Sequence, residues 1–214
     1  KTVRITAAPG LAAAGEEVRE LLERTILVAR SDEGKPDLEL VIGPAQPATP
    51  GPHLYASLDQ RGVIVDAVPL RHSSEHVHPL LTALAACHIA AAALHRVIGS
   101  SGLPRLGLPL SGDFAELGIP DGGLTTWFDI SGAVLVGGGA VGNGFLRALR
   151  HLRVRGTLAI VDPKVVGEGN PNRCLYFTGN QVGLPKAATL AQSAQPDFPE
   201  LKLEPHTCTF GERV

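Results

Sequence analysis

The feature that most constrains the fold of this sequence is a glycine-rich turn between an apolar segment and an amphipathic one. Ala133–Val136 is expected to form a short buried strand, and the turn after it contains Gly137, Gly139 and Gly142. The residues after the turn predict a helix, because apolar side chains recur at helical spacing. Its expected inward face consists of Val141, Phe145, Ala148, Leu149 and Leu152.

A second predicted strand, residues 157–161, ends at Asp162, and this acid follows Gly142 by 20 residues. A strand, a glycine turn, a helix and a second strand within about 30 residues form the context in which G-x-G-x-x-G indicates nucleotide binding. Glycine lets a phosphate approach the backbone, and the helix N-terminus offers free N–H groups and a positive dipole end. Asp162 is placed to accept hydrogen bonds from a ribose. A turn that merely connects strand to helix is the competing interpretation, which the placed acid disfavours.

Composition narrows the class of protein. The chain has 214 residues, with 44% hydrophobic and 19% charged residues, which allows one large or two small domains with a real core. The net charge is −2 and no basic run exceeds two residues, so we expect no nucleic-acid partner. Three widely spaced cysteines, Cys87, Cys174 and Cys208, favour a reduced, cytoplasmic setting.

Two further classes of site are not expected. The longest apolar stretch, residues 80–98, contains His88, His95 and Arg96, so we expect no membrane span. The histidines near this stretch lack a familiar metal-ligand spacing, and we assign no metal site to the chain.

We expect an α/β protein with three parts. Residues 1–100 predict a small α/β domain with strands at 2–6 and 38–42, a helix at 15–28 and a hairpin at 53–58 and 62–69. This domain ends in an alanine-rich helix over 73–99, with one apolar stripe: Leu80, Leu84, Cys87, Ala91, Leu94 and Ile98. Residues 101–128, rich in glycine and proline, predict an irregular linker. Residues 129–214 predict an incomplete Rossmann-like parallel sheet that binds a nucleotide.

The stretch 133–188 resembles the ThiF/MoeB/HesA family, the adenylating enzymes related to ubiquitin-activating enzyme. Four blocks carry the resemblance: Gly137-x-Gly139-x-x-Gly142, Asp162-Pro163-Lys164-Val165-Val166, Asn170-Pro171-Asn172-Arg173 and Val182-Gly183-x-x-Lys186. Residues 78–96 also resemble the helix that precedes this domain in some bacterial members. The two similarities cover about half of the chain.

The resemblance implies a set of ATP-binding residues. The glycine turn would hold ATP through Gly137, Gly139, Ala140 and Gly142, with Asp162 on the ribose. Asn170, Arg173 and Lys186 would reach the phosphates, where Arg offers paired, charge-assisted hydrogen bonds and Lys a point charge. Arg173 and Lys186 are therefore the candidate catalytic residues.

The reaction implied is attack by the C-terminal carboxylate of a ubiquitin-like or sulfur-carrier β-grasp protein on the α-phosphate of ATP. Positioning and charge neutralisation would supply the rate. Members pair as homodimers and use Mg²⁺, but the family's magnesium-binding Asp would lie beyond residue 214. We therefore expect this chain to be a fragment that lacks the full active site and is inactive in adenylation.

Departures from the family pattern keep two alternatives open. Lys164 stands where a second acid is common, and Cys174 where Gln or Tyr is usual. One alternative is an NAD-dependent oxidoreductase, and the other is a non-catalytic binding subunit. An ATP-binding enzyme is distinguished from an NAD-dependent one by Asn170, Arg173 and Lys186. A triphosphate needs their polar and charged groups, whereas a dinucleotide pyrophosphate is mostly bound by backbone N–H groups.

Overall fold

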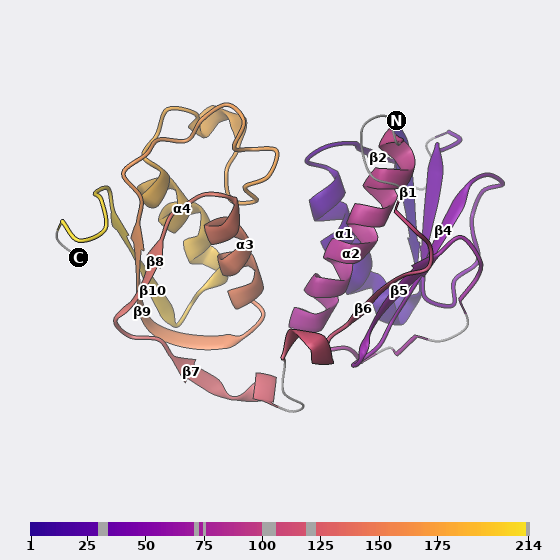
Figure 1. Ribbon diagram of the computed structural model, residues 1–214, viewed down its shortest axis with the longest axis horizontal. Coiled ribbons are helices and arrows are strands. Elements are labelled where there is room, and N and C mark those ends of the chain that lie inside the picture. The colour runs from indigo at the N-terminus through magenta and orange to yellow at the C-terminus, as the bar shows by residue number, and fades with distance from the viewer. Residues whose placement is uncertain (30–33, 71–72, 75, 100–105, 119–122, 213–214) are drawn as a thin grey trace. The chain divides into compact units, whose positions relative to one another are not determined.

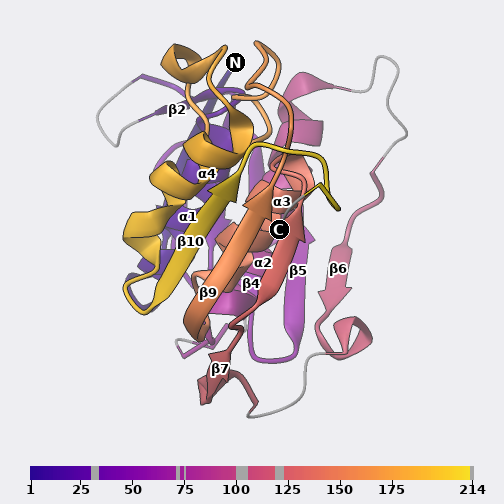
Figure 2. The same cartoon turned by 90° about the vertical axis from the view of Figure 1, so that its left-hand side faces the viewer.

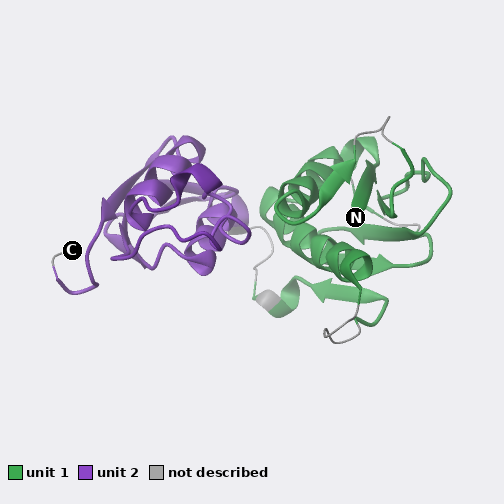
Figure 3. Ribbon diagram, turned by 90° about the horizontal axis from the view of Figure 1, so that it is seen from above, with its two compact units in different colours: residues 1–121 green, residues 122–214 purple. Residues whose placement is uncertain are grey.

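The computed structural model describes residues 1–29, 34–70, 73–74, 76–99, 106–118 and 123–212 (Figure 1). The chain divides into two compact units, Lys1–Asp121 and Gly122–Val214, each with its own sheet (Figure 3). Both sheets are built mainly from parallel strands with helices packed on them. This confirms the predicted α/β class with a Rossmann-like parallel sheet in the second unit.

Unit 1 contains a six-stranded sheet in the order β2-β1-β3-β4-β5-β6. Its strands are β1 (Thr2–Ala7), β2 (Leu27–Ala29), β3 (Leu38–Ile42), β4 (His53–Leu58), β5 (Gly62–Asp66) and β6 (Leu110–Asp113). The first four in that order are parallel, and β5 and β6 add antiparallel pairs at one edge. Helices α1 (Ala12–Leu22) and α2 (Pro79–Ile98) lie together on one face of the sheet (Figure 1). Short 3₁₀ turns occupy Pro9–Leu11 and Ala115–Leu117.

The first helix is shorter than the sequence indicated. We expected a helix over 15–28, whereas α1 spans Ala12–Leu22 and Leu27–Ala29 forms β2, paired in parallel with β1. Residues 25–28 are rich in β-branched side chains, which fit a strand better than a helix. Residues 27–29 pair with β1, and the local pattern alone does not reveal that distant partner.

The long helix α2 packs through a different face from the predicted one. Its alanine-rich side is buried, including Ala85, Ala86 and Ala93 at 0% exposure, because small side chains let α2 approach α1 and the sheet closely. The predicted stripe lies on the opposite side, where Cys87 and Ala91 are exposed and Ile98 is 53% exposed. The helix begins at Pro79 and not at residue 73 as expected, because proline suits a first helical turn, and Gly99, with φ of 81°, ends it.

By length and composition α2 is apolar enough to cross a membrane. However, 56% of its most apolar window is buried inside the protein, as in the core helix of a globular domain.

Part of the stretch expected to be an irregular linker belongs to the first sheet. Within 101–128, Leu110–Asp113 forms β6, which pairs with β5. Residues 101–105 and 119–122 lie outside the described residues. A third 3₁₀ turn, Gly123–Thr125, precedes strand β7 (Trp127–Asp129), which opens the sheet of unit 2.

Unit 2 contains a parallel sheet centred on β9 (Arg153–Val161). On one side β9 pairs with β10 (Leu201–His206), and on the other with β7 at its beginning and β8 (Ala133–Val136) at its end. Figure 2 shows β8, β9 and β10 running side by side. Helices α3 (Ala140–Leu149) and α4 (Lys186–Ala194) lie on the same side of the sheet (Figure 1). Two 3₁₀ turns, Gly179–Gln181 and Gln195–Asp197, flank α4.

The core of unit 2 fills the space between this sheet and its helices. It joins Leu146 of α3 and Leu190 of α4 to Leu158 and Ile160 of β9, all 2% exposed or less. The loop between β9 and α4 adds two fully buried side chains, Cys174 and Phe177. That loop is therefore anchored in the core.

Strand β8 is less buried than predicted. Ala133 and Leu135 pack against the core, but Val134 is 39% and Val136 57% exposed. Successive strand residues face opposite sides of a sheet, and in the described part of unit 2 the helices cover one side only.

The predicted inward face of α3 is correct at the end of the helix, where Leu149 is buried and Leu152, just beyond it, packs against the core. At the start of the helix the inward face is displaced by one residue. Val141 and Phe145 are 88% and 45% exposed, whereas Gly142, Asn143 and Leu146 are buried. The displacement has a steric cause, because the start of α3 lies against the backbone of the glycine turn and needs a residue without a side chain there.

Candidate functional site

The glycine turn joins the end of β8 to the start of α3, and two of its glycines have a structural explanation. Gly137 has a φ of 98°, a conformation that other residues rarely adopt. A Cβ at Gly142 would lie 2.1 Å from the carbonyl oxygen of Gly137, so no other residue fits there. Around Gly139 a Cβ would meet no atom within 4 Å. Packing does not explain glycine at that position, and the open space beside it leaves room for a ligand.

Asp162 lies against this turn, directly after β9. The side chain is 6% exposed, its Oδ2 accepts a hydrogen bond from the N–H of Gly138 at 2.8 Å, and its Oδ1 accepts one from the N–H of Lys164 at 2.8 Å. An ionised carboxylate has about four acceptor positions, so the two bonds leave capacity for a ligand hydroxyl. The structure thus brings the predicted acid and the predicted turn together.

Lys186 also lies beside the turn. It is the first residue of α4, and its N–H donates to the carbonyl oxygen of Lys164 at 2.9 Å. A Cβ placed on Gly138 would be 3.5 Å from the Cβ of Lys186 and 3.6 Å from Oδ2 of Asp162. Turn, acid and lysine therefore meet at Gly138, with exposed Lys164 on the neighbouring segment.

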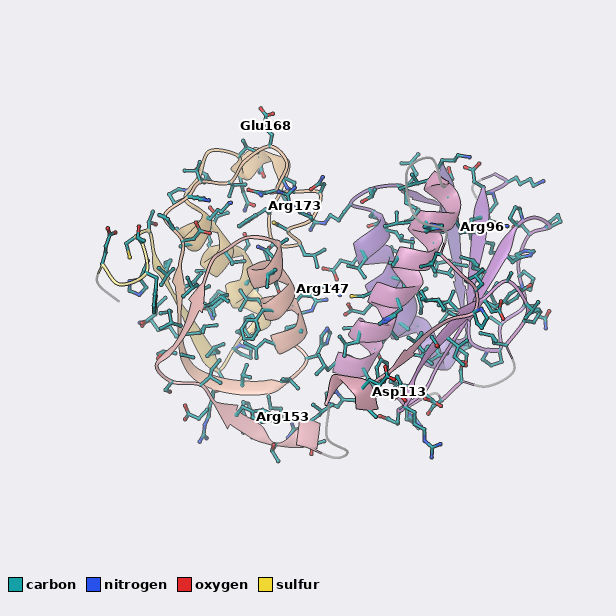
Figure 4. The ribbon with its side chains drawn as sticks, in the orientation of Figure 1. Arg96, Asp113, Arg147, Arg153, Glu168 and Arg173 are labelled. Atoms are coloured by element: carbon teal, nitrogen blue, oxygen red, sulfur yellow. The ribbon has the colours of Figure 1, made fainter. Side chains whose placement is uncertain are left out.

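The loop after β9 carries the other two predicted residues, Asn170 and Arg173. Asn170 is 8% exposed, and its Oδ1 accepts a hydrogen bond from the N–H of Gly167 at 2.8 Å. The exposed Arg173 donates through Nη1 to the carbonyl oxygen of Gly169 at 2.6 Å. Both sets of bonds lie within the loop itself, and Figure 4 shows Arg173 there together with the outward-pointing Glu168. The loop thus holds Asn170 and Arg173 in place. These hydrogen bonds join the two residues to their own loop and not to the glycine turn.

Asn143, one residue after Gly142, connects the turn to this loop, and the sequence analysis missed it. Its side-chain Nδ2 donates to the carbonyl oxygens of Gly138 and Gly139, both at 3.0 Å, and its Oδ1 accepts from the N–H of Tyr176 at 3.0 Å. The residue is 0% exposed. The available signal was a polar amide four residues after Gly139, on the side of the helix where the core begins.

A second missed contact attaches the end of the loop to the helices. The hydroxyl of Tyr176 donates to Oδ2 of Asp197 at 2.6 Å, and Nη1 of Arg150, just after α3, lies 3.6 Å from the same oxygen. Burial, together with the hydrogen bond to Asp197 and its negative charge, raises the pKa of Tyr176 above the ordinary value. The hydroxyl therefore stays protonated and remains a donor at neutral pH.

Cationic side chains outnumber acidic ones in the segments that follow β9 and begin α4. Lys164, Arg173 and Lys186 are present there, against Asp162 and Glu168. Among residues 1–29, 34–70, 73–74, 76–99, 106–118 and 123–212, no group of three His, Cys, Asp or Glu side chains is arranged to hold a metal ion. The described residues thus offer no ready-made cluster of three carboxylate, imidazole or thiolate ligands for Mg²⁺.

Comparisons with known proteins assign each unit to a domain family. The family model described as the E1 N-terminal domain matches residues 1–120, which is more than half of the chain. The model of the ThiF family matches residues 116–213. A search of curated proteins finds no match.

Among solved structures, the chain is similar to Escherichia coli MccB. For MccB with AMPCPP and selenomethionine MccA, the identity is 17% and the TM-score 0.35, covering 39% of this chain and 24% of that one. For MccB alone the identity is 17% and the TM-score 0.34, covering 37% of this chain and 22% of that one. For MccB with succinimide the identity is 18% and the TM-score 0.34, covering 38% of this chain and 25% of that one. The chain thus spans about a quarter of the length of the MccB chains it matches.

Proposed function

We propose that this chain takes part in ATP-dependent adenylation of a C-terminal carboxylate, because it belongs to the family of the E1 N-terminal domain and matches the ThiF family model over residues 116–213. One observation carries the proposal. The N–H of Gly138 is hydrogen-bonded to Asp162, and Lys186 begins its helix at the same point, so a glycine turn, an acid and a cation converge. This combination matches the ribose and phosphates of a nucleotide.

Each group has a separate task in the proposed site. The N–H groups at the start of α3 and the positive end of its dipole face the phosphates. The carboxylate of Asp162 accepts a hydrogen bond from a ribose hydroxyl. It uses the acceptor positions that its bonds from the N–H groups of Gly138 and Lys164 leave unused. Lys186 neutralises phosphate charge, and Arg173, on the loop anchored by Cys174 and Phe177, adds a second cation.

The proposed chemistry needs little covalent participation by the protein. The substrate carboxylate attacks the α-phosphorus, the bond to the bridging oxygen breaks, and pyrophosphate leaves with its electron pair. Charge builds on the leaving group, so cations fixed beforehand around the phosphates lower the barrier. Asn170 is proposed to position the loop that carries Arg173, since its Oδ1 and its carbonyl oxygen hold the turn that precedes the arginine.

We propose as substrate a ubiquitin-like or sulfur-carrier β-grasp protein, or a peptide that presents a comparable C-terminus. A homodimer is also proposed, because unit 2 exposes apolar side chains along β7 and α3. Trp127 is 51%, Phe128 39%, Val141 88% and Phe145 45% exposed. Light scattering at rising concentration tests the homodimer. We also propose a cytoplasmic location, which the three widely spaced cysteines of the sequence favour.

We further propose that the 214-residue chain alone does not form an acyl-adenylate. Mg²⁺ is held by carboxylates together with substrate phosphates, and the described residues supply no such cluster. ATP–pyrophosphate exchange by this chain should stay at background with candidate carrier proteins. Exchange well above background would contradict this part of the proposal.

Calorimetry with ATP and NAD tests the nucleotide assignment. We expect tighter binding of ATP, since cations beside the turn favour a triphosphate over a pyrophosphate that backbone groups can bind. Lys186→Ala should weaken ATP binding, and Lys202→Ala is the matched control, because exposed Lys202 lies on β10 and pairs with Glu204 at 2.8 Å. Equal or tighter binding of NAD would favour an oxidoreductase instead.

A further inference from the structure

Asn143 is buried at the start of α3 with both N–H donors and the oxygen of its side chain engaged. The two donors bond to the carbonyl oxygens of Gly138 and Gly139, and the oxygen accepts from the N–H of Tyr176. These partners fix the orientation of the amide, because a flipped amide would face two carbonyls with its oxygen. The carbonyl oxygen of Gly139 also accepts from the backbone N–H of Asn143 at 2.9 Å. One residue therefore holds two consecutive peptide groups of the turn, that of Gly138 through its side chain and that of Gly139 through side chain and backbone.

The direction of those carbonyls determines the direction of the next two N–H groups. In a planar trans peptide the C=O and the following N–H point in opposite directions. With the carbonyls of Gly138 and Gly139 held toward Asn143, the N–H groups of Gly139 and Ala140 point away from it. Both lie at the N-terminus of α3, where no intrahelical acceptor exists for them.

The space beside the Cα of Gly139 is open. A Cβ added at Gly139 would meet no atom within 4 Å. By contrast, the N–H of Gly138 is already used by Asp162. In this turn the N–H of Gly138 is therefore bonded to Asp162, while the N–H groups of Gly139 and Ala140 are held in a fixed direction beside open space.

We propose that Asn143 is a positioning residue that presents the N–H groups of Gly139 and Ala140 to the phosphates of a bound nucleotide; this inference rests on the proposed function. Through Tyr176 the same side chain also fixes the distance between the turn and the loop that carries Arg173. The carboxylate of Asp162 accepts from the N–H groups of Gly138 and Lys164, whereas Asn143 holds the carbonyl oxygen of Gly138. We therefore expect a change at Asn143 to affect the phosphate-binding groups more strongly than the proposed ribose acceptor.

Three substitutions separate this role from a general contribution to folding. Asn143→Asp keeps the size but places a charged oxygen against two carbonyl oxygens. Asn143→Ser keeps one hydrogen-bond donor in a smaller side chain. If Asn143→Asp does not fold, the test of the positioning role uses Asn143→Ser. Asn180→Asp makes the same chemical change at an exposed residue of a 3₁₀ turn and is the matched control.

The experiment compares ATP with adenosine, each measured by calorimetry on the full chain, with thermal unfolding recorded for every variant. We expect Asn143→Asp to lose about tenfold or more in ATP affinity, which equals about 1.4 kcal/mol, and less than about threefold in adenosine affinity. Asn143→Ser should show a smaller loss of the same kind, and Asn180→Asp should bind as the wild type does.

A parallel loss of ATP and adenosine affinity, or no loss of either, would overturn the inference. The ratio of the two affinities is the informative quantity, because a purely structural role weakens both ligands together. If the wild-type chain binds neither ligand, the proposed function itself fails, and that result is distinct from a wild type that binds ATP and variants that bind it equally well.

Discussion

The N–H of Gly138 donates a 2.8 Å hydrogen bond to Oδ2 of Asp162, which lies 24 residues later in the chain. The two residues follow adjacent parallel strands, β8 and β9, whose carboxyl ends meet at one edge of the sheet. Ligands of open α/β sheets bind at such edges. The acid therefore contributes to the shape of the turn and also retains acceptor positions for a ligand.

Replacing Asp162 tests its ligand-binding role. Asp162→Ala should weaken ATP binding by about 1–3 kcal/mol, the range for losing hydrogen bonds to a charged group. Loss of the bonds from Gly138 and Lys164 should also lower the melting temperature. Glu200→Ala, which removes an exposed acid just before β10, should leave ATP affinity unchanged. An unaltered ATP affinity in a folded Asp162→Ala protein would show that the acid serves the turn alone.

Two glycines of α3 form a matched pair for testing the close contact at the turn. A Cβ at Gly142 would lie 2.1 Å from the carbonyl oxygen of Gly137, whereas one at Gly144 would meet no atom within 4 Å. Gly142→Ala should destabilise the protein by about 1–3 kcal/mol through overpacking. Gly144→Ala should stabilise it by about 0.5–1 kcal/mol, because alanine loses less backbone entropy in a helix. Urea unfolding of both variants measures this difference, and equal effects would contradict the described turn.

Substitutions on the buried side and on the exposed side of α2 should differ in their effect on the free energy of unfolding. Ala86 is 0% exposed, so Ala86→Leu should cost about 1–3 kcal/mol of unfolding free energy by overpacking. Ile98 is 53% exposed, and Ile98→Ala should change stability much less than a buried Ile→Ala does, which is about 2–5 kcal/mol. Should Ile98→Ala prove the more damaging change, the leucine-containing stripe would be the packed face after all.

The sequence was sufficient where local chemistry decides the structure. Gly137 needs a positive φ, Gly142 needs the absence of a side chain, and Asp162 ends a strand, so the strand, turn and helix could all be placed. It was insufficient where a distant partner decides. Leu27–Ala29 is a strand only because β1 lies beside it, and Leu110–Asp113 only because β5 does.

Burial was the least predictable property, since it depends on which side of an element is covered. Apolar periodicity placed Val141 and Phe145 inside, but the contact between Gly142 and Gly137 turns the next residue, Asn143, inward instead. The same periodicity selected the larger side chains of α2 as its core face, whereas close packing on α1 and the sheet selects alanine. Asn143 was missed for a related reason, because its role depends on carbonyl directions that only the folded turn reveals.

Glu39 on β3 is 1% exposed and organises the loop between β3 and β4. Its Oε1 accepts hydrogen bonds from the hydroxyl of Thr6 at 2.6 Å and the N–H of Ala48 at 2.7 Å. Its Oε2 accepts from the N–H and hydroxyl of Thr49 at 2.9 and 2.7 Å. Burial by itself raises the pKa of Glu39, but these hydrogen bonds outweigh it, and the pKa lies below the ordinary value.

A lowered pKa in the folded state makes the contribution of Glu39 depend on pH in one direction. The ionised group stabilises the fold fully above the ordinary glutamate pKa of about 4.3, and this stability is lost as the pH falls through the lowered pKa. Glu39→Gln should therefore reduce the free energy of unfolding by about 1–3 kcal/mol at pH 7. The difference from the wild type should shrink as the pH falls below the ordinary glutamate pKa of about 4.3 and through the lowered pKa, where the wild-type carboxylate also becomes neutral.

Urea unfolding of both proteins across this range measures the effect. His53, whose Nε2 lies 3.8 Å from Oε2 of Glu39, and Arg4 on the neighbouring strand are the basic groups to consider. Because both proteins carry the same His53 and Arg4, the pH dependence of the difference between them reports on Glu39. A difference that stays constant from pH 7 to pH 2 would mean that the lost hydrogen-bond geometry, and not the charge of Glu39, accounts for the stability.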